Sequence, residues 1–438
     1  MPALPRALFP AASAVVSRLS GYLILIAAAR LLHPESFGVF AVLAAVAAVA
    51  NAFVSGGGDM WLNRLTWGAR GPKGRAPYLW HFYITTVAML AVAVFALSIV
   101  VAYSVRPLYP FRAEIVWALS WAAIAGIAEA LLAVARAGGM TRMFFGVRDL
   151  AVPLSILGIV VVVRPDTPGG IFTIFAAVWL AALIVIGVAL AARGRDLLPP
   201  VRWRKSVWRK LVAHTAGLIY GNLGSRLSVY IDVLVLTWLI SLADLGEYRI
   251  AAQIAVGFIV VQHFVFLGLP WQLRQIGTPR DPGAGHAAVI WRQRTLLSMS
   301  LLALVVLLLA ATPLLALFGQ RFTDVAPVFR ILLVVRFCEL LWGPQHEVLV
   351  SNGHILEDAR SNVIALAAWV ATFAIAYLYA TPVAAVVTGN VAASLTAHAM
   401  RYEMIERVGL RHGAGHGFGP LLPVLLSLAM GVIAMLAL

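Results

Sequence analysis

Long apolar runs recur along this chain, each close to the roughly 20 residues that a helix needs to cross the hydrocarbon core of a bilayer. A backbone in lipid must satisfy its own hydrogen bonds, so such runs are expected to be helices. With 62% hydrophobic and 12% charged residues, the chain is too apolar for one soluble core. We predict an all-α polytopic membrane protein with twelve spans, at about 10–30, 37–58, 79–104, 113–135, 149–163, 171–192, 211–240, 245–270, 295–318, 326–350, 361–379 and 383–400.

Apolar runs also lie near both ends of the chain. The first apolar run is longer than the apolar part of a secretory signal, and further spans follow it, so we predict a retained helix. A thirteenth apolar run, 420–438, predicts an extra C-terminal helix, and whether that helix crosses the membrane is left open.

The net charge of +15 is distributed unevenly along the chain. With a cytoplasmic N-terminus, 23 lysines and arginines fall in the segments on the cytoplasmic side and five fall in the opposite loops. This asymmetry is the positive-inside rule, and it orients the protein. Nucleic-acid binding would need a soluble basic domain, which the sequence lacks. The single cysteine, Cys338, excludes an intrachain disulfide and a cysteine metal cluster, and no cofactor is predicted.

A basic segment divides six spans from six. Residues 194–210 contain paired prolines, two tryptophans and several arginines and lysines, which suits either a segment on the cytoplasmic leaflet or a plain linker. Sequence similarity supports a duplication around it, because SRLSGY at 17–22 returns as SRLSVY at 225–230. At the same offset of 208 residues, Phe40 aligns with Tyr248.

Two six-helix lobes follow from this duplication. An even number of spans makes the repeat parallel, with its axis along the membrane normal, and lobes of this kind can rock around a central cavity. We therefore predict an N-terminal lobe at 1–193, the linker at 194–210, a C-terminal lobe at 211–408, and a cytoplasmic loop with the extra helix at 409–438.

Three short motifs resemble bacterial polysaccharide and O-antigen flippases. The first is the Leu-x-Pro-Glu-x-Phe-Gly turn at 32–38, followed after the helix by Arg64. The second combines an acid on the seventh span with a Gly-x-Tyr-x-x-Ala sequence on the eighth, here Asp232 and residues 246–251. The third is a Pro before a Phe-Gly turn, within 313–332.

The resemblance places the chain in the multidrug/oligosaccharidyl-lipid/polysaccharide exporter superfamily and implies the MATE-like exporter fold. It implies a flippase, not an enzyme, that moves undecaprenyl-diphosphate-linked oligosaccharide across the bacterial inner membrane, for lipopolysaccharide or exopolysaccharide assembly. The implied partners are the polyprenyl-diphosphate-linked glycan, membrane lipids and other polysaccharide-assembly membrane proteins. The single extra C-terminal run departs from relatives, which often have none or two.

Charges at membrane depth mark candidate binding residues, because each costs at least about 2.5–3.5 kcal/mol unless it faces a cavity or a partner. Arg18 shares a helix face with Tyr22, and its repeat equivalent Arg226 shares one with Asn222 and Tyr230. Two guanidinium groups around one cavity would suit a diphosphate. The alternative is that both arginines extend to the cytoplasmic headgroups.

The eighth and tenth spans carry further candidates. Arg249 and Gln253 form one stripe on the eighth span, although Arg249 lies early enough to reach the outer headgroups instead. On the tenth span Arg336 is a candidate cavity residue and Glu339 a candidate ion-coupling residue, but their spacing also allows them simply to pair with each other.

Two isolated acids, Glu129 and Asp232, are also candidates for ion coupling, since a buried carboxylate can exchange protons near neutral pH. The structural alternatives are a pairing of Glu129 with Arg136 and a hydrogen bond between Asp232 and Ser228.

Two other functions remain open. A cation-coupled multidrug antiporter shares the architecture, but it would favour an apolar cavity with few arginines. A membrane glycosyltransferase or polymerase needs an external loop with catalytic acids or histidines, whereas the external loops here are about ten residues or shorter and no catalytic motif is found.

Overall fold

A computed structural model describes the protein at residues 4–55, 84–96, 99, 111–137, 140–192, 221–224, 226–258, 282–342, 345–346, 349 and 354–407. The chain forms two compact units, 1–226 and 227–438, here called the N unit and the C unit. Helices account for nearly all of the described residues, and none of these residues belongs to a β-strand. The predicted all-α class is therefore confirmed. The predicted lobe boundaries stay predictions, and 194–210 and 409–438 lie outside the described residues.

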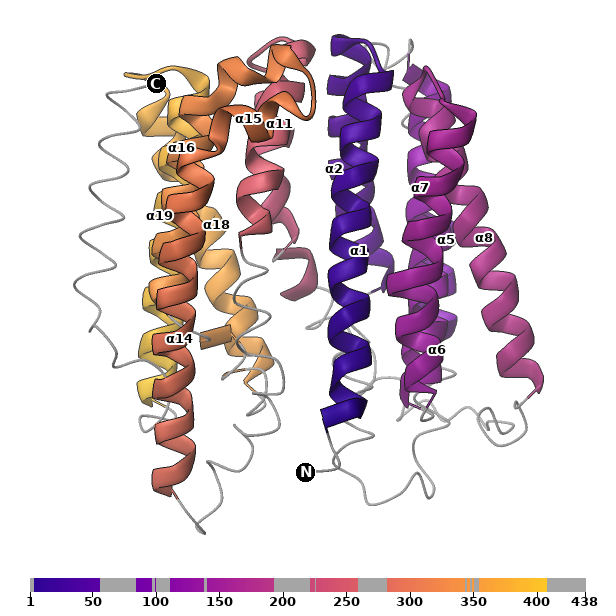
Figure 1. Cartoon of the computed structure of the whole chain (residues 1–438), viewed down its shortest axis with the longest axis horizontal. Helices are drawn as coiled ribbons and strands as arrows, with labels where there is room; N and C mark the ends of the chain where they lie inside the picture. The colour runs from indigo at the N-terminus through magenta and orange to yellow at the C-terminus, as the bar shows by residue number, and fades with distance from the viewer. Residues whose placement is uncertain are drawn as a thin grey trace. The chain divides into compact units, whose positions relative to one another are not determined.

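Within the N unit the helices lie side by side as a bundle (Figure 1). α5 packs against both α2 and α8, and α1 packs against α7. The labelled elements are α1 (Leu4–Leu31), α2 (Pro34–Ser55), α5 (Arg112–Ala137), α6 (Thr141–Phe145), the π-helix η2 (Gly146–Ala151), α7 (Val152–Val163) and α8 (Pro168–Ala192), with an apolar helix at Ile84–Ala96.

The C unit begins at the second residue of a helix at 226–236. It continues with α11 (Leu242–Gly257), α14 (Pro282–Leu309), α15 (Ala311–Ala316), the 3₁₀-helix η3 (Gln320–Val325), α16 (Ala326–Leu341), α18 (Ile355–Ala376) and α19 (Pro382–Arg407). α18 and α19 form a tightly packed hairpin, and α16 packs against α11, α14 and α19. Figure 1 shows α16, α18 and α19 as orange and yellow helices.

Seven helices in the described part of the chain are long and apolar enough to cross a membrane, and each coincides with a predicted span. They are Ala12–Leu31, Pro34–Ser55, Arg112–Arg136, Thr141–Val163, Pro168–Ala192, Leu356–Ala376 and Pro382–Arg407. The other five predicted spans fall partly outside the described residues or appear as shorter helices.

One predicted boundary differs from the structure by about two helical turns. The fifth span was predicted to begin at 149, but helix begins at Thr141 and passes through η2 before Pro153. Proline has no amide hydrogen for the carbonyl four residues earlier, and a π-helical turn is one way to accommodate that gap. Arg142 and Arg148 therefore lie on helical segments.

A second predicted span, 295–318, is also interrupted. α14 ends at Leu309, and Ala310 leaves the helical conformation before α15 begins. Leu309 lies four residues before Pro313, so its carbonyl is the one that loses a donor. Similarly, the predicted span 326–350 is helical as α16 only to Leu341, and the bend predicted at Pro344 lies outside the described residues.

Close helix packing in the N unit depends on one small residue. A Cβ placed on Gly126 of α5 would lie 2.4 Å from Val54 Cγ1 of α2, so only glycine permits this approach. The remaining buried face of α5 is rich in alanine, including Ala118, Ala122 and Ala125. Small residues at the contact allow helices in lipid to gain van der Waals packing and polar contacts at short range.

Candidate functional site

A buried acid and a buried tyrosine form the centre of the candidate site in the C unit. The hydroxyl of Tyr248, on α11, donates to Asp232 Oδ2 at 2.7 Å, and the backbone N–H of Val233 donates to Asp232 Oδ1 at 2.7 Å. Both side chains are buried. The carboxylate of Asp232 thus has a hydrogen-bond partner sixteen residues away in sequence. Ser228 was the partner suggested by the sequence.

Arg249 lies next to Tyr248 on the same helix but turns its side chain inward. Its guanidinium carbon lies 4.8 Å from the centre of the Tyr230 ring, and the residue is buried in the protein. A guanidinium group over an aromatic face is stabilised by the quadrupole of the ring. The side chain of Arg249 is therefore covered by protein, and its position at a cavity stays a prediction.

Arg336 and Glu339 form the ion pair that their spacing allows. Arg336 Nη1 lies 2.8 Å from both carboxylate oxygens of Glu339, on α16. Both side chains are largely covered. The charge of Arg336 also interacts with that of Asp232. The structure therefore brings Arg336, Glu339 and Asp232 into one electrostatic group.

Together these residues form a charge cluster in the C unit, here defined as Asp232, Tyr248, Arg249, Tyr230, Arg336 and Glu339. The two acids balance the two arginines when all four are ionised, which lowers the cost of holding charge at membrane depth. Adding or removing one proton or cation would unbalance the group. Such an arrangement can respond electrostatically to an ion or to an anionic ligand.

In the N unit, Arg18 lies in a second group of charges. Its charge interacts with Asp149 of η2, as do those of Arg136 and Arg148. Arg148 Nε lies 3.9 Å from Asp149 Oδ1, and the guanidinium carbon of Arg136 lies 4.9 Å from the centre of the Phe144 ring. Arg18 itself is exposed, so protein atoms do not cover its guanidinium group. The face of α1 that carries Arg18 remains accessible to a ligand or to lipid.

The remaining candidate residues differ in their exposure and in their hydrogen-bond partners. Asn222 Nδ2 donates to the carbonyl of Ala52 at 2.9 Å and to Ser55 Oγ at 3.4 Å, both at the C-terminal end of α2. Its amide nitrogen therefore already has a structural partner. Arg226 is exposed, while Tyr22 of α1 and Gln253 of α11 are half-buried.

Glu129 has a partner that the sequence did not suggest. With the amide of Asn51 oriented so that both its polar atoms are satisfied, Nδ2 donates to Glu129 Oε2 at 3.3 Å and Oδ1 accepts from the N–H of Gly126 at 3.2 Å. Asn51 is on α2, so this contact joins α2 to α5 beside the close approach at Gly126. The contact gives Glu129 a structural role.

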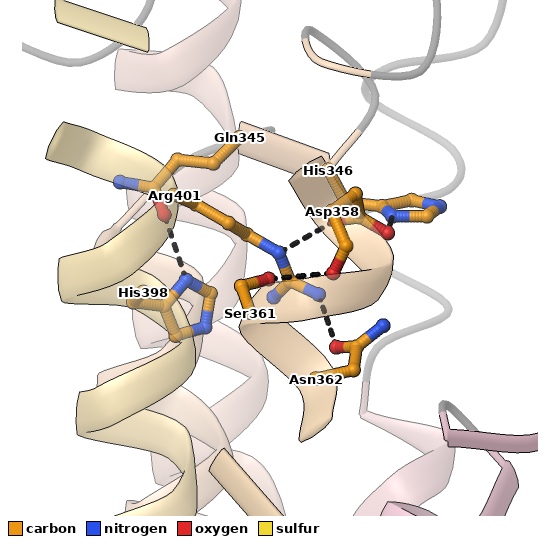
Figure 2. Close-up of polar contacts among 7 residues, drawn as sticks. All are labelled: Gln345, His346, Asp358, Ser361, Asn362, His398 and Arg401. Atoms are coloured by element: carbon orange, nitrogen blue, oxygen red, sulfur yellow. Dashed lines mark hydrogen bonds and ion pairs between the residues drawn. The ribbon is translucent and has the colours of Figure 1, made fainter. Parts of the chain in front are cut away.

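A polar network in the C unit was missed by the sequence analysis (Figure 2). Asp358, near the start of α18, accepts from Arg401 Nε of α19 at 2.7 Å and lies 2.9 Å from His346 Nδ1. Arg401 Nη2 also donates to Asn362 Oδ1 at 2.6 Å. Polar residues near the ends of two predicted spans were the available signal, but nothing in the sequence pairs them.

Metal binding finds no support among the described residues, where no group of three or more histidine, cysteine, aspartate or glutamate side chains could hold an ion.

Comparison with known proteins agrees with this fold. A model of the family described as "Polysaccharide biosynthesis protein" matches residues 7–267, more than half of the chain. None of the curated proteins matches the sequence significantly.

Solved transporters share the fold at low sequence identity. A eukaryotic MATE transporter, AtDTX14, is 10% identical with a TM-score of 0.67, and each chain covers 99% of the other. An inward-facing multidrug resistance MATE family transporter of the MOP superfamily is 14% identical with a TM-score of 0.66, over 92% of this chain and 99% of that one. The lipid II flippase MurJ is 12% identical with a TM-score of 0.60, over 99% and 98%. These likenesses confirm the MATE-like exporter fold.

Proposed function

Because the chain belongs to the family of polysaccharide biosynthesis proteins and has a membrane transporter fold, we propose that it flips undecaprenyl-diphosphate-linked oligosaccharide from the cytoplasmic to the periplasmic leaflet. The family match over residues 7–267 carries this proposal. Added support comes from the shared fold with MurJ, whose cargo is itself a lipid, lipid II. The product would serve surface or exopolysaccharide assembly at the inner membrane, with other assembly proteins as partners.

The proposed diphosphate site consists of Arg18 and Arg226. Both are exposed in the structure, so their guanidinium groups are open to a ligand. Guanidinium stays ionised and can bind a phosphate with two parallel hydrogen bonds. Tyr22 of α1 and Tyr230 of the 226–236 helix, next along the same two faces, would line the site. Asn222 is assigned to helix packing because its amide nitrogen bonds to α2.

Alternating access of the two predicted lobes is the proposed mechanism. The C-unit charge cluster is its candidate coupling element, with Asp232 as the responding acid, since Glu339 is paired with Arg336 and Glu129 with Asn51. Uptake of a proton or cation at Asp232 would leave one positive charge in excess, because Glu339 balances only one of the two arginines. That surplus positive charge would favour a conformation in which an anionic ligand is bound.

Depletion of the protein in its host tests the substrate assignment. We expect polyprenyl-diphosphate-linked oligosaccharide to accumulate on the cytoplasmic leaflet while its synthesis continues. Extracted lipids analysed by mass spectrometry would identify the glycan. Normal surface polysaccharide without such an intermediate would refute the proposed function.

Single variants test the binding site. We expect Arg18→Ala and Arg226→Ala to stop export while the protein still inserts, and the corresponding lysine variants to be partly tolerated because lysine keeps charge but loses the planar fork. Arg407→Ala is the matched control, since it removes an exposed arginine paired with Glu403 at the end of α19. Normal export by both alanine variants would show that the site is wrongly assigned.

The alternative is a cation-coupled multidrug antiporter, and the fold is shared with a solved multidrug resistance MATE family transporter. The buried acid Asp232 suits that function as well. Loss of such a protein would raise susceptibility to cationic drugs and leave the lipid-linked glycan pool unchanged. The same depletion strain therefore distinguishes the two.

A further inference from the structure

The polar network of Figure 2 lies where three elements of the C unit end or begin. It joins residues 345–346, just after α16, to the first turns of α18 and the last turns of α19. The charge asymmetry of the sequence predicts that these ends face the cytoplasm. The network therefore lies on the side of the C unit that is predicted to be cytoplasmic, a few residues beyond Arg336 and Glu339 of the charge cluster.

Asp358 is the hub of this network. It is buried, and its two carboxylate oxygens have different partners: Oδ1 accepts from Arg401, and Oδ2 lies against the ring of His346. The backbone carbonyl of Asp358 also accepts from the hydroxyl of Ser361, at 2.7 Å. One carboxylate thereby ties the segment after α16 to the hairpin of α18 and α19.

A second set of contacts holds the same segment to α19. Gln345 Oε1 lies 3.0 Å from His398 Nδ1, and the ring of Trp342 stacks on the His398 ring with centroids 5.6 Å apart and planes 5° apart. Residues 342, 345 and 346 therefore reach both helices of the hairpin. Side chains, more than backbone, attach this segment.

The chain leaves the α16 helix just before this segment. α16 ends at Leu341, where the N–H of Trp342 bonds to the carbonyl of Glu339 in the tighter three-residue spacing. Pro344 has no amide hydrogen with which to continue the ladder. Separation of Trp342 from the hairpin would therefore leave α16, which ends at Leu341, intact.

The attached arrangement is also incompletely satisfied. In the described part of the chain, Trp342 Nε1 and Gln345 Nε2 are buried donors without a hydrogen-bond partner. Burial of such a donor costs free energy that contact with water would restore. Opening would relieve this cost, whereas the Asp358 contacts oppose opening.

We propose that Asp358, Arg401 and His346 form a latch that holds the end of α16 against α18 and α19, and that its release opens the cytoplasmic side of the C unit. The latch is a conformational device within one unit, and it does not depend on the identity of the cargo. Its charged contacts hold the closed form, and the two unsatisfied donors favour the open form. The sequence provides an internal reporter of this change.

Cys338 is that reporter. It is the single cysteine of the chain, it is buried in α16, and it lies about one helical turn before Trp342. In the full-length protein in detergent micelles, its rate of labelling by N-ethylmaleimide measures how often the end of α16 opens. Labelling of a buried thiol requires an opening event that exposes it.

We expect Asp358→Asn and Arg401→Gln each to speed labelling by about tenfold, the factor expected for loss of one hydrogen bond between charged groups. His346→Gln removes a more exposed contact and should speed it less. Glu403→Gln is the matched control, because it removes an exposed charge from the same end of α19, outside the network. Its labelling rate should equal that of the wild type.

The double variant Asp358→Asn/Arg401→Gln separates a latch from general destabilisation. Loss of one shared contact gives a rate close to that of either single variant, whereas two independent defects multiply. Wild-type labelling in Asp358→Asn, or a multiplicative double variant, would overturn the proposal. If Asp358→Asn does not purify as a folded protein, His346→Gln decides, since a rate equal to the wild type would overturn it too.

Discussion

Tyr248→Phe removes one oxygen atom from the centre of the C-unit charge cluster and leaves the ring in place. The hydroxyl donates at 2.7 Å to Asp232 Oδ2, and both side chains are buried. Phenylalanine fits the same space, so the variant tests the hydrogen bond and not the packing. Water cannot readily replace the lost donor in so closed a position.

The size of the effect depends on the charge of Asp232. A hydrogen bond to a charged group contributes about 1.5–3 kcal/mol to stability, and one between neutral groups about 0.5–1.5 kcal/mol. We expect Tyr248→Phe to lower the free energy of unfolding by about 1.5–3 kcal/mol if Asp232 is ionised. In an Asp232→Asn background the same change should cost only about 1 kcal/mol.

Reversible unfolding in mixed SDS–detergent micelles would measure all four members of this double-mutant cycle. Tyr379→Phe is the control, because Tyr379 lies at the end of the α18 helix and is 79% exposed. A coupling energy between Tyr248 and Asp232 below about 0.5 kcal/mol would refute the reasoning, since contacting partners normally exceed that value. It would mean that the hydroxyl does not stabilise the carboxylate.

Two further outcomes follow from packing and charge. Gly126→Ala places a Cβ 2.4 Å from Val54 Cγ1 and should lower the free energy of unfolding by about 1–3 kcal/mol in the same assay. Gly187→Ala is the control, because a Cβ there has nothing within 4 Å, and it should be neutral or stabilising. Equal effects of the two variants would contradict the close approach. A cysteine introduced near Lys205 should be labelled only from the cytoplasm and one near Asp244 only from outside, and the reverse pattern would contradict the orientation predicted from charge.

The fold was largely predictable because the bilayer imposes one repeating length on the sequence. Seven spans were placed within a few residues, apart from the start of the fifth and the end of the twelfth. Proline alters the helix in the fifth and ninth predicted spans, since Pro153 and Pro313 have no donor for the carbonyl four positions earlier. Counting back four residues from Pro313 gives Leu309, the observed end of α14. That rule was available from the sequence alone.

The site was less predictable, because its partners are distant in sequence. Arg336 and Glu339 could be paired in advance since they lie within one helical turn. The contact between Asp358 and Arg401 joins residues 43 positions apart, and it depends on how α18 packs against α19. Asn51 was missed for the same reason, because its role appears only where α2 meets α5.

The bond between Tyr248 and Asp232 has a further consequence when it is set beside the internal duplication. At the offset of 208 residues, Asp232 aligns with Ile24 and Tyr248 with Phe40. Both of these N-unit residues are buried and apolar. Two aligned positions would then form an apolar packing contact in one copy and a hydrogen bond between a tyrosine and an aspartate in the other. At these two aligned positions the C unit carries a hydrogen-bonded acid where the N unit carries only apolar packing, so the two segments cannot be exchanged.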